Sequence, residues 1–521
     1  MSKAGFGGAV TAALALALAF RLAGAAARPM HHDEANQAVK FGELLETGDY
    51  RYDRNDHHGP TLYYLTLPAA WARGQATLAS LDERTLRAVP ALFGAGLILL
   101  LVPLARGLGR PAAAAAAMLA AVSPLLVYYS RFYIQESLFA CFSLACLAAV
   151  GRFAERPSRA AALCAGWCAG LAYATKETSI LLLPAVAAAA LLARGSAERD
   201  GSVQPAPAGD RRARRSAAAL GLAAAVATAF VFYSSICKYP GGLLESVRSF
   251  GIYAARGAGA GPHAQPFGYY ARMLAFSSSG GLVWSEGLIL GLAAAGMIAS
   301  SRRTPGAGAG FWPRYVALYS LIAFLAFSAV PYKTPWNAVP FHTGFVIMAG
   351  VGAAAVLEWL RSRLLKAVAL LALAAAAAQL GVQSWRASFP YSADPRNPYV
   401  YAHTVPDFLR LVQRVRDVAA RSPDGMRTPV KVVAGPYEQW PLPWYLRGMT
   451  RVGYWTRAAD ADPLDEAPLI VASQEHAGEV GAALGDRYVQ EFYGLRPEVV
   501  LTLFVERSAW DRLIAARAAA P

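Results

Sequence analysis

Two adjacent carboxylates, Asp33 and Glu34, follow the first long apolar stretch of the chain, in the segment His31-His32-Asp33-Glu34-Ala35. A carboxylate just outside a membrane can act as a general base that accepts the proton of an attacking hydroxyl group. The same pair can instead mark the solvated start of a helix, where the helix dipole favours acidic side chains. The pair alone supports the two interpretations equally.

The same loop carries further polar side chains, in Asp53, Asp56-His57-His58-Gly59-Pro60 and Tyr63-Tyr64. Four histidines and several acids in one loop could bind a metal ion, but their spacing matches no defined zinc pattern. We therefore expect no metal or other cofactor, with a divalent ion as the alternative. His57 and His58 are assigned to charge and hydrogen bonding near a sugar phosphate, and the alternative is an ordinary polar surface.

Three later segments each bring a cation to the boundary of an apolar stretch, next to polar or aromatic neighbours. They are Arg131-Phe132-Tyr133-Ile134-Gln135-Glu136, Lys176-Glu177 and Pro331-Tyr332-Lys333-Thr334-Pro335-Trp336-Asn337. Lys, Arg, Tyr and Trp also anchor helices at the membrane interface, so each segment alone has a simpler explanation. As a set they supply candidates to bind a donor phosphate or sugar: Arg131, Tyr133, Glu136, Lys176, Glu177, Lys333, Trp336 and Asn337.

The elements that hold these residues are membrane helices. The chain has 521 residues, of which 56% are hydrophobic and 16% charged, whereas soluble domains carry about 25% charged residues. Its apolar blocks are long enough to cross a bilayer core, which takes about 20 residues per helix. We predict a mostly α, polytopic membrane protein with about eleven spans. They lie near residues 5–27, 88–106, 111–129, 137–151, 160–175, 178–194, 216–236, 282–300, 315–331, 341–360 and 367–385.

Every second loop between the predicted spans is rich in Lys and Arg, as the positive-inside rule requires of cytoplasmic loops. The basic residues are Lys3, Arg106, Arg110, Arg152, Arg156, Arg159, Arg302, Arg303, Arg314, Arg361, Arg363, Lys366 and those of 194–215. The N-terminus is therefore predicted to be cytoplasmic, and Gly195–Arg215 to be a disordered basic cytoplasmic loop. This bias also explains the net charge of +15, so we expect no nucleic-acid partner. The polar segments described above share the opposite face.

The chain after the last span reads as a separate domain. We divide the chain into a membrane domain, 1–385, whose first outer loop is 28–87, and an extracytoplasmic α/β domain, 386–521. Strands are predicted by β-branched content and helices by their starting residues. The strands are Val430–Ala434, Leu469–Ala472 and Val499–Val505, and the helices start at Thr404-Val405-Pro406-Asp407 and cover Ser508–Arg517.

One loop of this domain combines two tryptophans, two prolines and an arginine: Trp440 and Pro441-Leu442-Pro443-Trp444-Tyr445-Leu446-Arg447. Tryptophan faces stack on sugar rings, and arginine forks onto phosphate oxygens. We predict that Trp440, Trp444 and Arg447 close the acceptor side of the site containing Asp33. The alternative is a membrane-surface anchor.

The order of these segments resembles the GT-C glycosyltransferases, in particular the protein O-mannosyltransferase and aminoarabinose-transferase superfamily. The closer likeness is to a prokaryotic family described as flippase-activity-associated and linked to archaeal-type glycosylation. The similar segments are Asp33-Glu34-Ala35, His58-Gly59-Pro60 with Tyr63-Tyr64, Pro331–Asn337 and Pro441–Arg447. Aminoarabinose transferases carry Lys-Pro-Pro where this chain has His58-Gly59-Pro60, which leaves the donor sugar open.

The resemblance implies a multi-pass transferase of the cytoplasmic membrane. It would move a sugar from a polyprenyl-phosphate carrier to a hydroxyl of a glycan, lipid or protein on the outer face. We expect an inverting reaction in which Asp33 is the base and Glu34 orients the acceptor or keeps the loop in register. Cations at the outer boundary would stabilise the leaving phosphate. The rival hypothesis is a non-catalytic component of lipid-linked sugar translocation or assembly, which needs cations for the head group but no carboxylate at the anomeric carbon.

Overall fold

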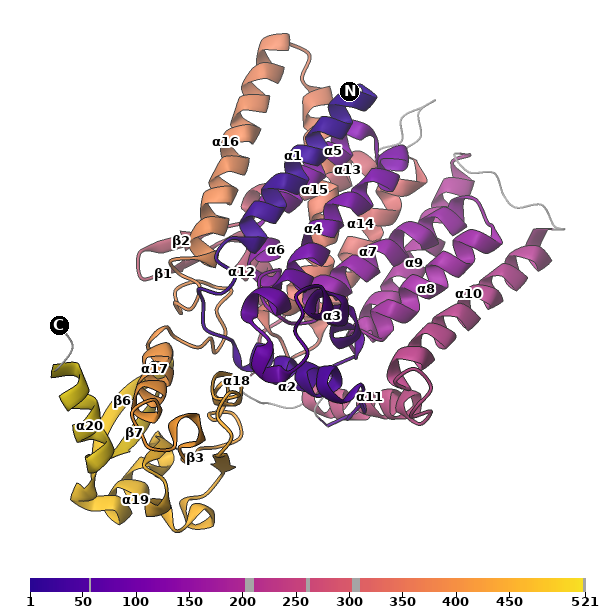
Figure 1. The fold of residues 1–521 in the computed structure, drawn as a ribbon. Helices are drawn as coiled ribbons and strands as arrows, with labels where there is room; N and C mark the ends of the chain where they lie inside the picture. Colours follow the sequence, from indigo (N-terminus) through magenta and orange to yellow (C-terminus); the bar gives the residue numbers. More distant parts are fainter. Residues whose placement is uncertain (56–57, 202–209, 259–262, 302–309, 519–521) are drawn as a thin grey trace.

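The computed structural model describes residues 1–55, 58–201, 210–258, 263–301 and 310–518, and a helical bundle makes up most of them (Figure 1). Each predicted span overlaps a helix, and the span 111–129 is divided between two. The helices are α1 (Lys3–Leu22), α4 (Glu83–Leu108), α5 (Arg110–Val122), α6 (Pro124–Tyr129), α7 (Glu136–Glu155), α8 (Arg159–Tyr173), α9 (Ser179–Arg199), α10 (Asp210–Tyr233), α13 (Gly287–Ser301), α14 (Phe311–Ala329), α15 (Val339–Trp359) and α16 (Arg363–Ser388).

By length and composition, 8 helices of the described residues could cross a membrane: α1, α4, α7, α9, α10, α14, α15 and α16. Two apolar helices, α5 and α13, are shorter, and α8 has 15 residues. The span predicted near 282–300 begins too early, because Leu282–Trp284 is β2, which pairs with β1 (Ser277–Ser279) in a hairpin. Ser123 breaks the helix between α5 and α6, where Pro124 starts the next one.

The many small residues let the helices of the bundle approach closely, as is common between membrane helices. A Cβ atom added at Gly166 of α8 would lie 1.9 Å from the carbonyl oxygen of Gly221 in α10. One added at Gly352 of α15 would lie 1.8 Å from the carbonyl oxygen of Leu292 in α13. Larger side chains at these positions would force the helices apart.

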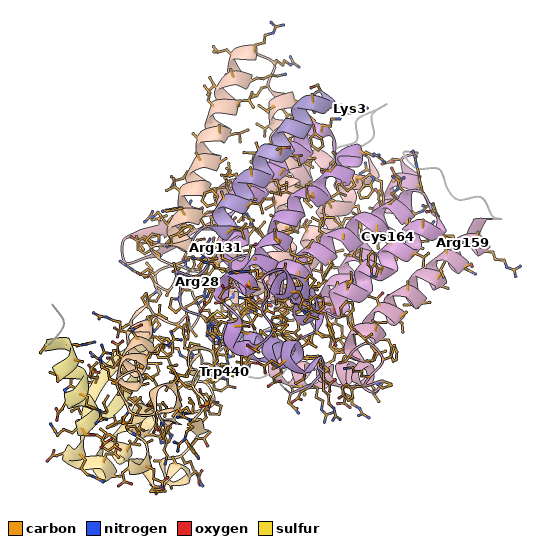
Figure 2. The ribbon with its side chains drawn as sticks, viewed as in Figure 1. Lys3, Arg28, Arg131, Arg159, Cys164 and Trp440 are labelled. Carbon is orange, nitrogen blue, oxygen red and sulfur yellow. The ribbon has the colours of Figure 1, made fainter. Side chains whose placement is uncertain are left out.

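Short helices collect at one end of the bundle. They are α2 (His32–Thr47), α3 (Thr61–Ala72), α11 (Gly242–Ala258) and α12 (Tyr269–Ala275), with the 3-10 turns η1 (Leu78–Ser80) and η2 (Pro335–Ala338). Figure 1 shows α2, α3 and α11 at the same end as the C-terminal domain, and the N-terminus at the opposite end. Figure 2 likewise shows Lys3 far from Arg28, Arg131 and Trp440. The polar segments predicted to share one face therefore lie at one end of the bundle.

The C-terminal domain is a five-stranded mixed sheet with strand order β4-β3-β5-β7-β6. Its strands are β3 (Val430–Val433), β4 (Val452–Trp455), β5 (Leu469–Ser473), β6 (Tyr488–Arg496) and β7 (Val499–Glu506). Its helices are α17 (Asp407–Ala419), α18 (Leu442–Tyr445), α19 (Gln474–Leu484) and α20 (Arg507–Ala518), with the turns η3 (Gly425–Arg427), η4 (Ala458–Ala461), η5 (Leu464–Glu466) and η6 (Gly485–Arg487). β3 is parallel to β4 and β5, and β7 is antiparallel to β5 and β6. The α/β prediction is confirmed.

Two local predictions differ from the structure. α17 begins at Asp407 with Pro406 as its cap, so the hydroxyl of Thr404 does not cap it. The predicted disorder of Gly195–Arg215 is wrong at both ends, because α9 and α10 extend into it. In α9, Arg194 and Glu198 form an i,i+4 ion pair of 2.7 Å that stabilises the helical turn. The middle of that loop, 202–209, lies outside the described residues.

Candidate functional site

Glu34 is completely buried between two arginines. Arg28 places Nη1 2.7 Å from Oε2 and Nη2 3.1 Å from Oε1 of Glu34, and Arg87 places Nε 2.8 Å from Oε1 and Nη2 3.0 Å from Oε2. The backbone N–H groups of His31 and Tyr133 donate to the same carboxylate at 2.9 and 2.8 Å. Six donors thus hold this one side chain.

These contacts fix the first turn of α2. Burial by itself raises the pKa of Glu34, but the charges and hydrogen bonds of Arg28 and Arg87 outweigh it and hold the pKa far below its usual value. Glu34 also closes a capping box with His31 at the N-terminus of α2. Of the two roles expected for Glu34, this geometry favours keeping the loop in register.

Asp33, in contrast, keeps 36% of its side chain exposed. Its backbone N–H donates to Nδ1 of His31 at 3.1 Å, and Nε2 of His31 lies 3.1 Å from the carbonyl oxygen of Tyr401. Because Nδ1 accepts, Nε2 carries the proton and donates to Tyr401. The His31 ring also lies 6.0 Å from that of Trp336. The backbone of Asp33 is therefore held by the buried His31 ring, while the carboxylate of Asp33 stays accessible.

Three residues that were predicted as separate candidates meet in one buried group. Lys176, from the turn between α8 and α9, forms an ion pair with Glu136 at the start of α7. The Lys176 ammonium also donates to Oδ1 of Asn337 in η2 at 3.0 Å. An ammonium group has three N–H donors, and these two contacts use two of them.

Two connections link the Lys176 group to the turn that carries Asp33. Trp336 faces His31, while its neighbour Asn337 binds Lys176. Gln37, one turn after Asp33 on α2, accepts a hydrogen bond of 3.1 Å from Gln135, the residue before Glu136. The carboxylate and the ammonium therefore belong to one connected site at the end of the bundle.

His58 and Glu177 form a second pair beside this group. The backbone N–H of His58 donates to Oε1 of Glu177 at 3.0 Å, and Nδ1 lies 3.1 Å from Oε2. A Cβ atom at Gly59 would lie 2.0 Å from the carbonyl oxygen of Ala174, so only glycine allows this approach. His57 lies outside the described residues.

The other two predicted cations of the membrane domain have backbone partners. Arg131 donates to the carbonyl oxygens of Phe20 at 2.6 Å and Arg21 at 3.2 Å, and burial together with the charges of neighbouring arginines lowers its pKa to about 9. Lys333 is buried and donates to the carbonyl oxygens of Gln265 at 2.9 Å and Val330 at 2.6 Å. Both side chains therefore hold backbone segments in place.

Tyr133 is buried as well. Its hydroxyl donates to Oγ1 of Thr66 at 3.0 Å, and its backbone N–H binds Glu34. Tyr133 thus links α3 to the Glu34 cluster, and its side chain contributes to packing in that region. Of the predicted donor-side residues, the structure brings Glu136, Lys176 and Asn337 together and places Trp336 between them and His31.

The segment 440–447 of the C-terminal domain lies against the first loop. Trp444 Nε1 donates to Oε1 of Glu83 at 2.9 Å, and Arg447 donates to the carbonyl oxygens of Leu78 at 3.1 Å and Leu81 at 2.6 Å. Trp444 is completely buried, so its ring cannot stack on an acceptor as predicted, and Trp444 and Arg447 instead attach this segment to the first loop. Trp440 lies apart from both, with its ring 5.9 Å from the ring of His32.

Comparisons with known proteins agree with this architecture. A family model described as dolichyl-phosphate-mannose-protein mannosyltransferase matches residues 66–203. ArnT from Cupriavidus metallidurans, in a structure bound to undecaprenyl phosphate, is similar over 95% of this chain and 98% of its own, with 17% identity and a TM-score of 0.60. The archaeal oligosaccharyltransferase AglB from Archaeoglobus fulgidus, in complex with an inhibitory peptide and a dolichol-phosphate, is similar over 97% of this chain and 77% of its own, with 13% identity and a TM-score of 0.59.

The chain shares the GT-C fold of these two structures. It is a multi-pass membrane protein with a C-terminal α/β domain. No curated protein sequence matches it significantly. The narrower likeness to the flippase-activity-associated family stays a prediction.

The arginines that hold Glu34 were missed as site residues, although the sequence contained a signal for them. Arg28 and Arg87 are the first and last residues of the first loop, 28–87. A charge that is buried at a membrane boundary needs a partner of opposite sign, so an acid between two boundary arginines is a candidate for such a cluster.

A second buried polar cluster within the GT-C bundle was also missed. The Oε2 atom of Glu286 lies 2.7 Å from Oγ of Ser123 and 2.9 Å from Nε2 of His342. Its Oε1 accepts hydrogen bonds from the N–H of Leu125 at 2.8 Å and the hydroxyl of Tyr399 at 3.0 Å. Ionisable residues within apolar stretches are rare, and both Glu286 and His342 fall inside predicted spans. The cluster joins α13, α15 and the α5–α6 break to the segment that leads into the C-terminal domain.

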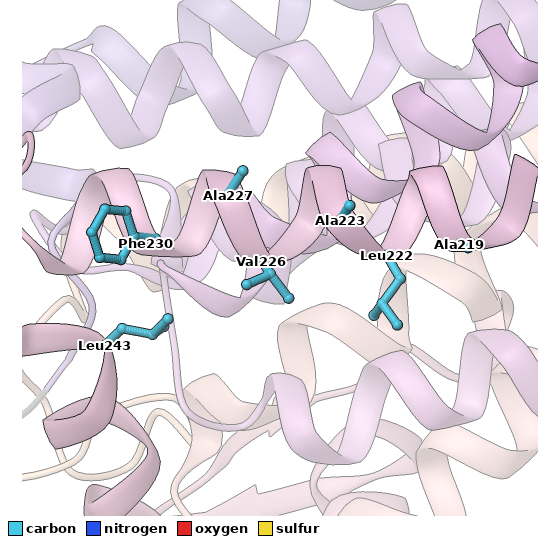
Figure 3. Close-up of a pocket in the computed structure, with 7 residues that line it drawn as sticks. All are labelled: Ala219, Leu222, Ala223, Val226, Ala227, Phe230 and Leu243. Carbon is cyan, nitrogen blue, oxygen red and sulfur yellow. The ribbon is translucent and has the colours of Figure 1, made fainter. Parts of the chain in front are cut away.

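An apolar groove of about 520 Å³ runs along α10 of the GT-C bundle (Figure 3). Its lining residues are Ala219, Leu222, Ala223, Val226, Ala227, Phe230 and Leu243. The groove ends one turn before Tyr233, whose hydroxyl donates to the carbonyl oxygen of Tyr173 at 3.2 Å. Tyr173 lies in α8, which leads directly into the turn that carries Lys176 and Glu177. A hydrocarbon chain in the groove would therefore end near these polar residues.

A metal ion needs a group of His, Cys, Asp or Glu side chains around it. Within the described ranges, no three His, Cys, Asp or Glu side chains come close enough to hold an ion together. In the C-terminal domain, Asp460 pairs with Arg457 at 2.7 Å on the surface.

Proposed function

We propose that this chain is an integral-membrane glycosyltransferase that moves a sugar from a polyprenyl-phosphate-linked donor to an acceptor hydroxyl. The observation that carries the proposal is the contrast between the two adjacent carboxylates. Glu34 is buried and held by six donors, and Asp33 beside it remains accessible on the turn that Glu34 holds. A preorganised carboxylate of this kind suits a base whose position must be fixed.

In the proposed reaction Asp33 acts as the general base of an inverting transfer. The acceptor oxygen attacks the anomeric carbon from the face opposite the phosphate, and its proton passes to the carboxylate of Asp33. The bond between the anomeric carbon and the phosphate oxygen breaks, and its electron pair leaves on that oxygen. Polyprenyl phosphate is a weakly basic leaving group, so the reaction needs no general acid.

Lys176 is the proposed partner of the leaving phosphate. Its ammonium is fixed by Glu136 and Asn337 and retains a third N–H donor. A fixed cation in a site that excludes water stabilises developing charge more strongly than one in solution. His58 and Glu177, in the adjacent loop and turn, are proposed to contact the donor head group. We propose that no metal ion is required, so transfer should persist in EDTA.

The proposed place for the polyprenyl tail is the groove on α10. Its lining is apolar, and it ends near the turn that carries Lys176. A long isoprenoid chain gains free energy from every methylene group it buries. This arrangement would place the lipid beside the bundle and the phosphate at the polar end.

The site is proposed to lie on the extracytoplasmic side of the cytoplasmic membrane. Lys3 and the loop between α15 and α16, with Arg361, lie at the opposite end of the bundle from α2. Basic loops stay on the cytoplasmic side. The N-terminus is then cytoplasmic, and the C-terminal domain is outside.

A reconstituted transfer assay tests the function. Purified protein in liposomes receives polyprenyl-phosphate sugars with a radiolabel in the sugar, and label in acceptor material or in released sugar is measured. We expect release or transfer that depends on Asp33. If the wild type and the Asp33→Asn variant both leave every donor intact, yet both support translocation of the lipid-linked sugar, the protein is a transport component and the proposal is wrong.

A further inference from the structure

Two aromatic rings of the C-terminal domain pack against the residue that precedes Asp33. This residue is His32, in the first turn of α2. The rings of Tyr437 and Trp440, from the loop between β3 and α18, each lie 5.9 Å from the His32 ring. Tyr437 is 72% exposed, which is unusual for a large aromatic side chain in a folded domain.

The guanidinium group of Arg496 lies next to Tyr437. Arg496, at the end of β6, donates from Nη2 to the carbonyl oxygen of Tyr437 at 2.6 Å. Burial lowers the pKa of Arg496, and the negative charges of Glu438 and Asp33 oppose that effect. The arginine therefore orders the Tyr437 loop and lies within electrostatic reach of Asp33.

A second group of rings lies within electrostatic reach of Asp33. Nδ1 of His263 is hydrogen-bonded to the hydroxyl of Tyr401, and the His263 ring lies 4.8 Å from that of Tyr332. The negative charge of Asp33 acts on both His263 and Tyr401. The charge of Asp33 therefore reaches His263 of the bundle and Tyr401 of the segment that leads into the C-terminal domain.

Aromatic faces beside a carboxylate and a guanidinium match the chemistry of a sugar ring. A pyranose has apolar C–H faces that pack on aromatic rings, while its hydroxyl groups donate to carboxylates and accept from guanidinium groups. A lipid acceptor would need a continuous apolar surface, but the side chains here end in imidazole, phenol, carboxylate and guanidinium groups. The observations therefore favour a saccharide over a lipid.

We infer that the acceptor is a saccharide whose ring packs against Tyr437 and Trp440 and whose attacking hydroxyl donates to Asp33. This inference rests on the proposed glycosyltransferase function. It adds Tyr437, Arg496 and His32 as acceptor-binding residues. A protein side chain as acceptor is the alternative that the experiment must separate.

The test identifies the group to which the transferred sugar is attached. Cells of the source organism that lack this protein are complemented with the wild type or with the variants Asp33→Asn, Tyr437→Ala and Phe492→Ala. Phe492 is the matched control, because it is an aromatic residue of β6 with 67% exposure and lies four residues before Arg496. Mass spectrometry of envelope glycans, glycopeptides and glycolipids then locates the sugar that appears only with the wild type.

We expect this sugar on the hydroxyl of another sugar. The Asp33→Asn variant should lack it, and Tyr437→Ala should reduce the initial rate of its addition about three- to tenfold, as expected for one lost aromatic contact. In the reconstituted assay, Tyr437→Ala should raise the KM for the isolated glycan acceptor and leave the KM for the donor unchanged. Phe492→Ala should match the wild type in both measurements.

The outcomes separate the two proposals. A sugar that is lost in Asp33→Asn but is attached to a Ser, Thr or Asn side chain or to a lipid head group would overturn the saccharide inference and leave the transferase function intact. A sugar attached to a saccharide whose addition is unchanged by Tyr437→Ala would overturn the assigned acceptor surface. Identical glycans in the wild type and Asp33→Asn would contradict the transferase function itself.

Discussion

The indole N–H of Trp444 donates to the carboxylate of Glu83 at 2.9 Å, and this contact joins the C-terminal domain to the first turn of α4. One turn later in α4, Arg87 binds Glu34, the neighbour of Asp33. Tyr445 adds a second connection, since its hydroxyl accepts a hydrogen bond of 2.9 Å from the N–H of Met30. The C-terminal domain is therefore attached to the segment that carries the proposed base.

Removing this attachment should loosen the first loop. Trp444→Phe keeps the aromatic packing but loses one hydrogen bond, which costs about 1 kcal/mol, and Arg447→Gln removes donors to Leu78 and Leu81. We expect faster amide hydrogen exchange in residues 78–83 and a lower transfer rate in both variants. Trp510→Phe, on α20 where the ring packs against Arg414, is the control. Unchanged exchange in both variants would show that these contacts do not hold the loop.

Replacing each of the two adjacent carboxylates by its amide should have different effects, on the transfer rate for Asp33 and on stability for Glu34. Asp33→Asn should lower transfer about 10²- to 10⁴-fold with an unchanged melting temperature, because its side chain is half-exposed. Glu34→Gln leaves two buried arginines without their counter-charge, which costs about 3 to 5 kcal/mol of stability. Melting temperature and transfer rate are measured on both purified variants. A stable Glu34→Gln protein would contradict the structural role of Glu34.

The stability that Glu34 contributes has a defined pH dependence. The folded-state pKa of Glu34 lies below the unfolded value of about 4.3, so the contribution is fully present above that value and is lost as the pH falls below it. The difference in melting temperature between the wild type and Glu34→Gln should therefore stay constant from about pH 5 to 8. This difference in melting temperature should become smaller at lower pH. A difference that already becomes smaller between pH 7 and 5 would contradict a lowered pKa of Glu34.

Replacing Lys176 should lower the rate of sugar transfer from the donor. Lys176→Met removes the cation proposed to stabilise the leaving phosphate, and we expect transfer to fall about 10²- to 10³-fold, as when a fixed donor is removed from an oxyanion site. Lys366→Met, in the first turn of α16 at the other end of the bundle, controls for the loss of a lysine. Initial rates with saturating acceptor and varied donor measure the effect. Equal rates in the two variants would exclude Lys176 from phosphate stabilisation.

Filling the groove on α10 should affect long-chain donors selectively. Val226→Trp places a large ring among the lining residues, so the KM for a C55 polyprenyl-phosphate sugar should rise several-fold. A C10 citronellyl-phosphate donor should be unaffected, because its chain is too short to need the groove. Leu191→Trp, at a 71% exposed position of α9, controls for a bulky side chain facing lipid. If both donors respond equally to Val226→Trp, the groove does not hold the tail.

The proposed orientation can be tested by labelling cysteines in intact cells. In a background without the five native cysteines, Gln474→Cys is an exposed position of the C-terminal domain, and Ser362→Cys lies exposed between α15 and α16. An impermeant maleimide should label the first and not the second until the cells are opened. The reverse pattern would place the site on the cytoplasmic side.

Much of the fold followed from local properties of the sequence. The eleven apolar stretches correspond to helices because backbone hydrogen bonds must be satisfied within each segment in a bilayer. In the C-terminal domain, β3, β5 and β7 were found because their buried runs are rich in β-branched residues. β4 and β6 were missed, because β4 contains a glycine and is only partly buried, and β6 contains a glycine and several polar residues and shows no regular alternation of buried and exposed side chains.

By itself, the sequence determined which residues stand at the ends of the spans, since hydrophobicity and charge decide where a helix meets water. Residue type and spacing could not show which of Asp33 and Glu34 is accessible, because the two have nearly the same chemistry and adjacent positions. Only the tertiary structure decided this, since α2 turns Glu34 toward Arg28 and Arg87 and leaves Asp33 accessible. Likewise, the meeting of Lys176 with Asn337 depends on the packing of helices far apart in the chain, and that packing has no local signal.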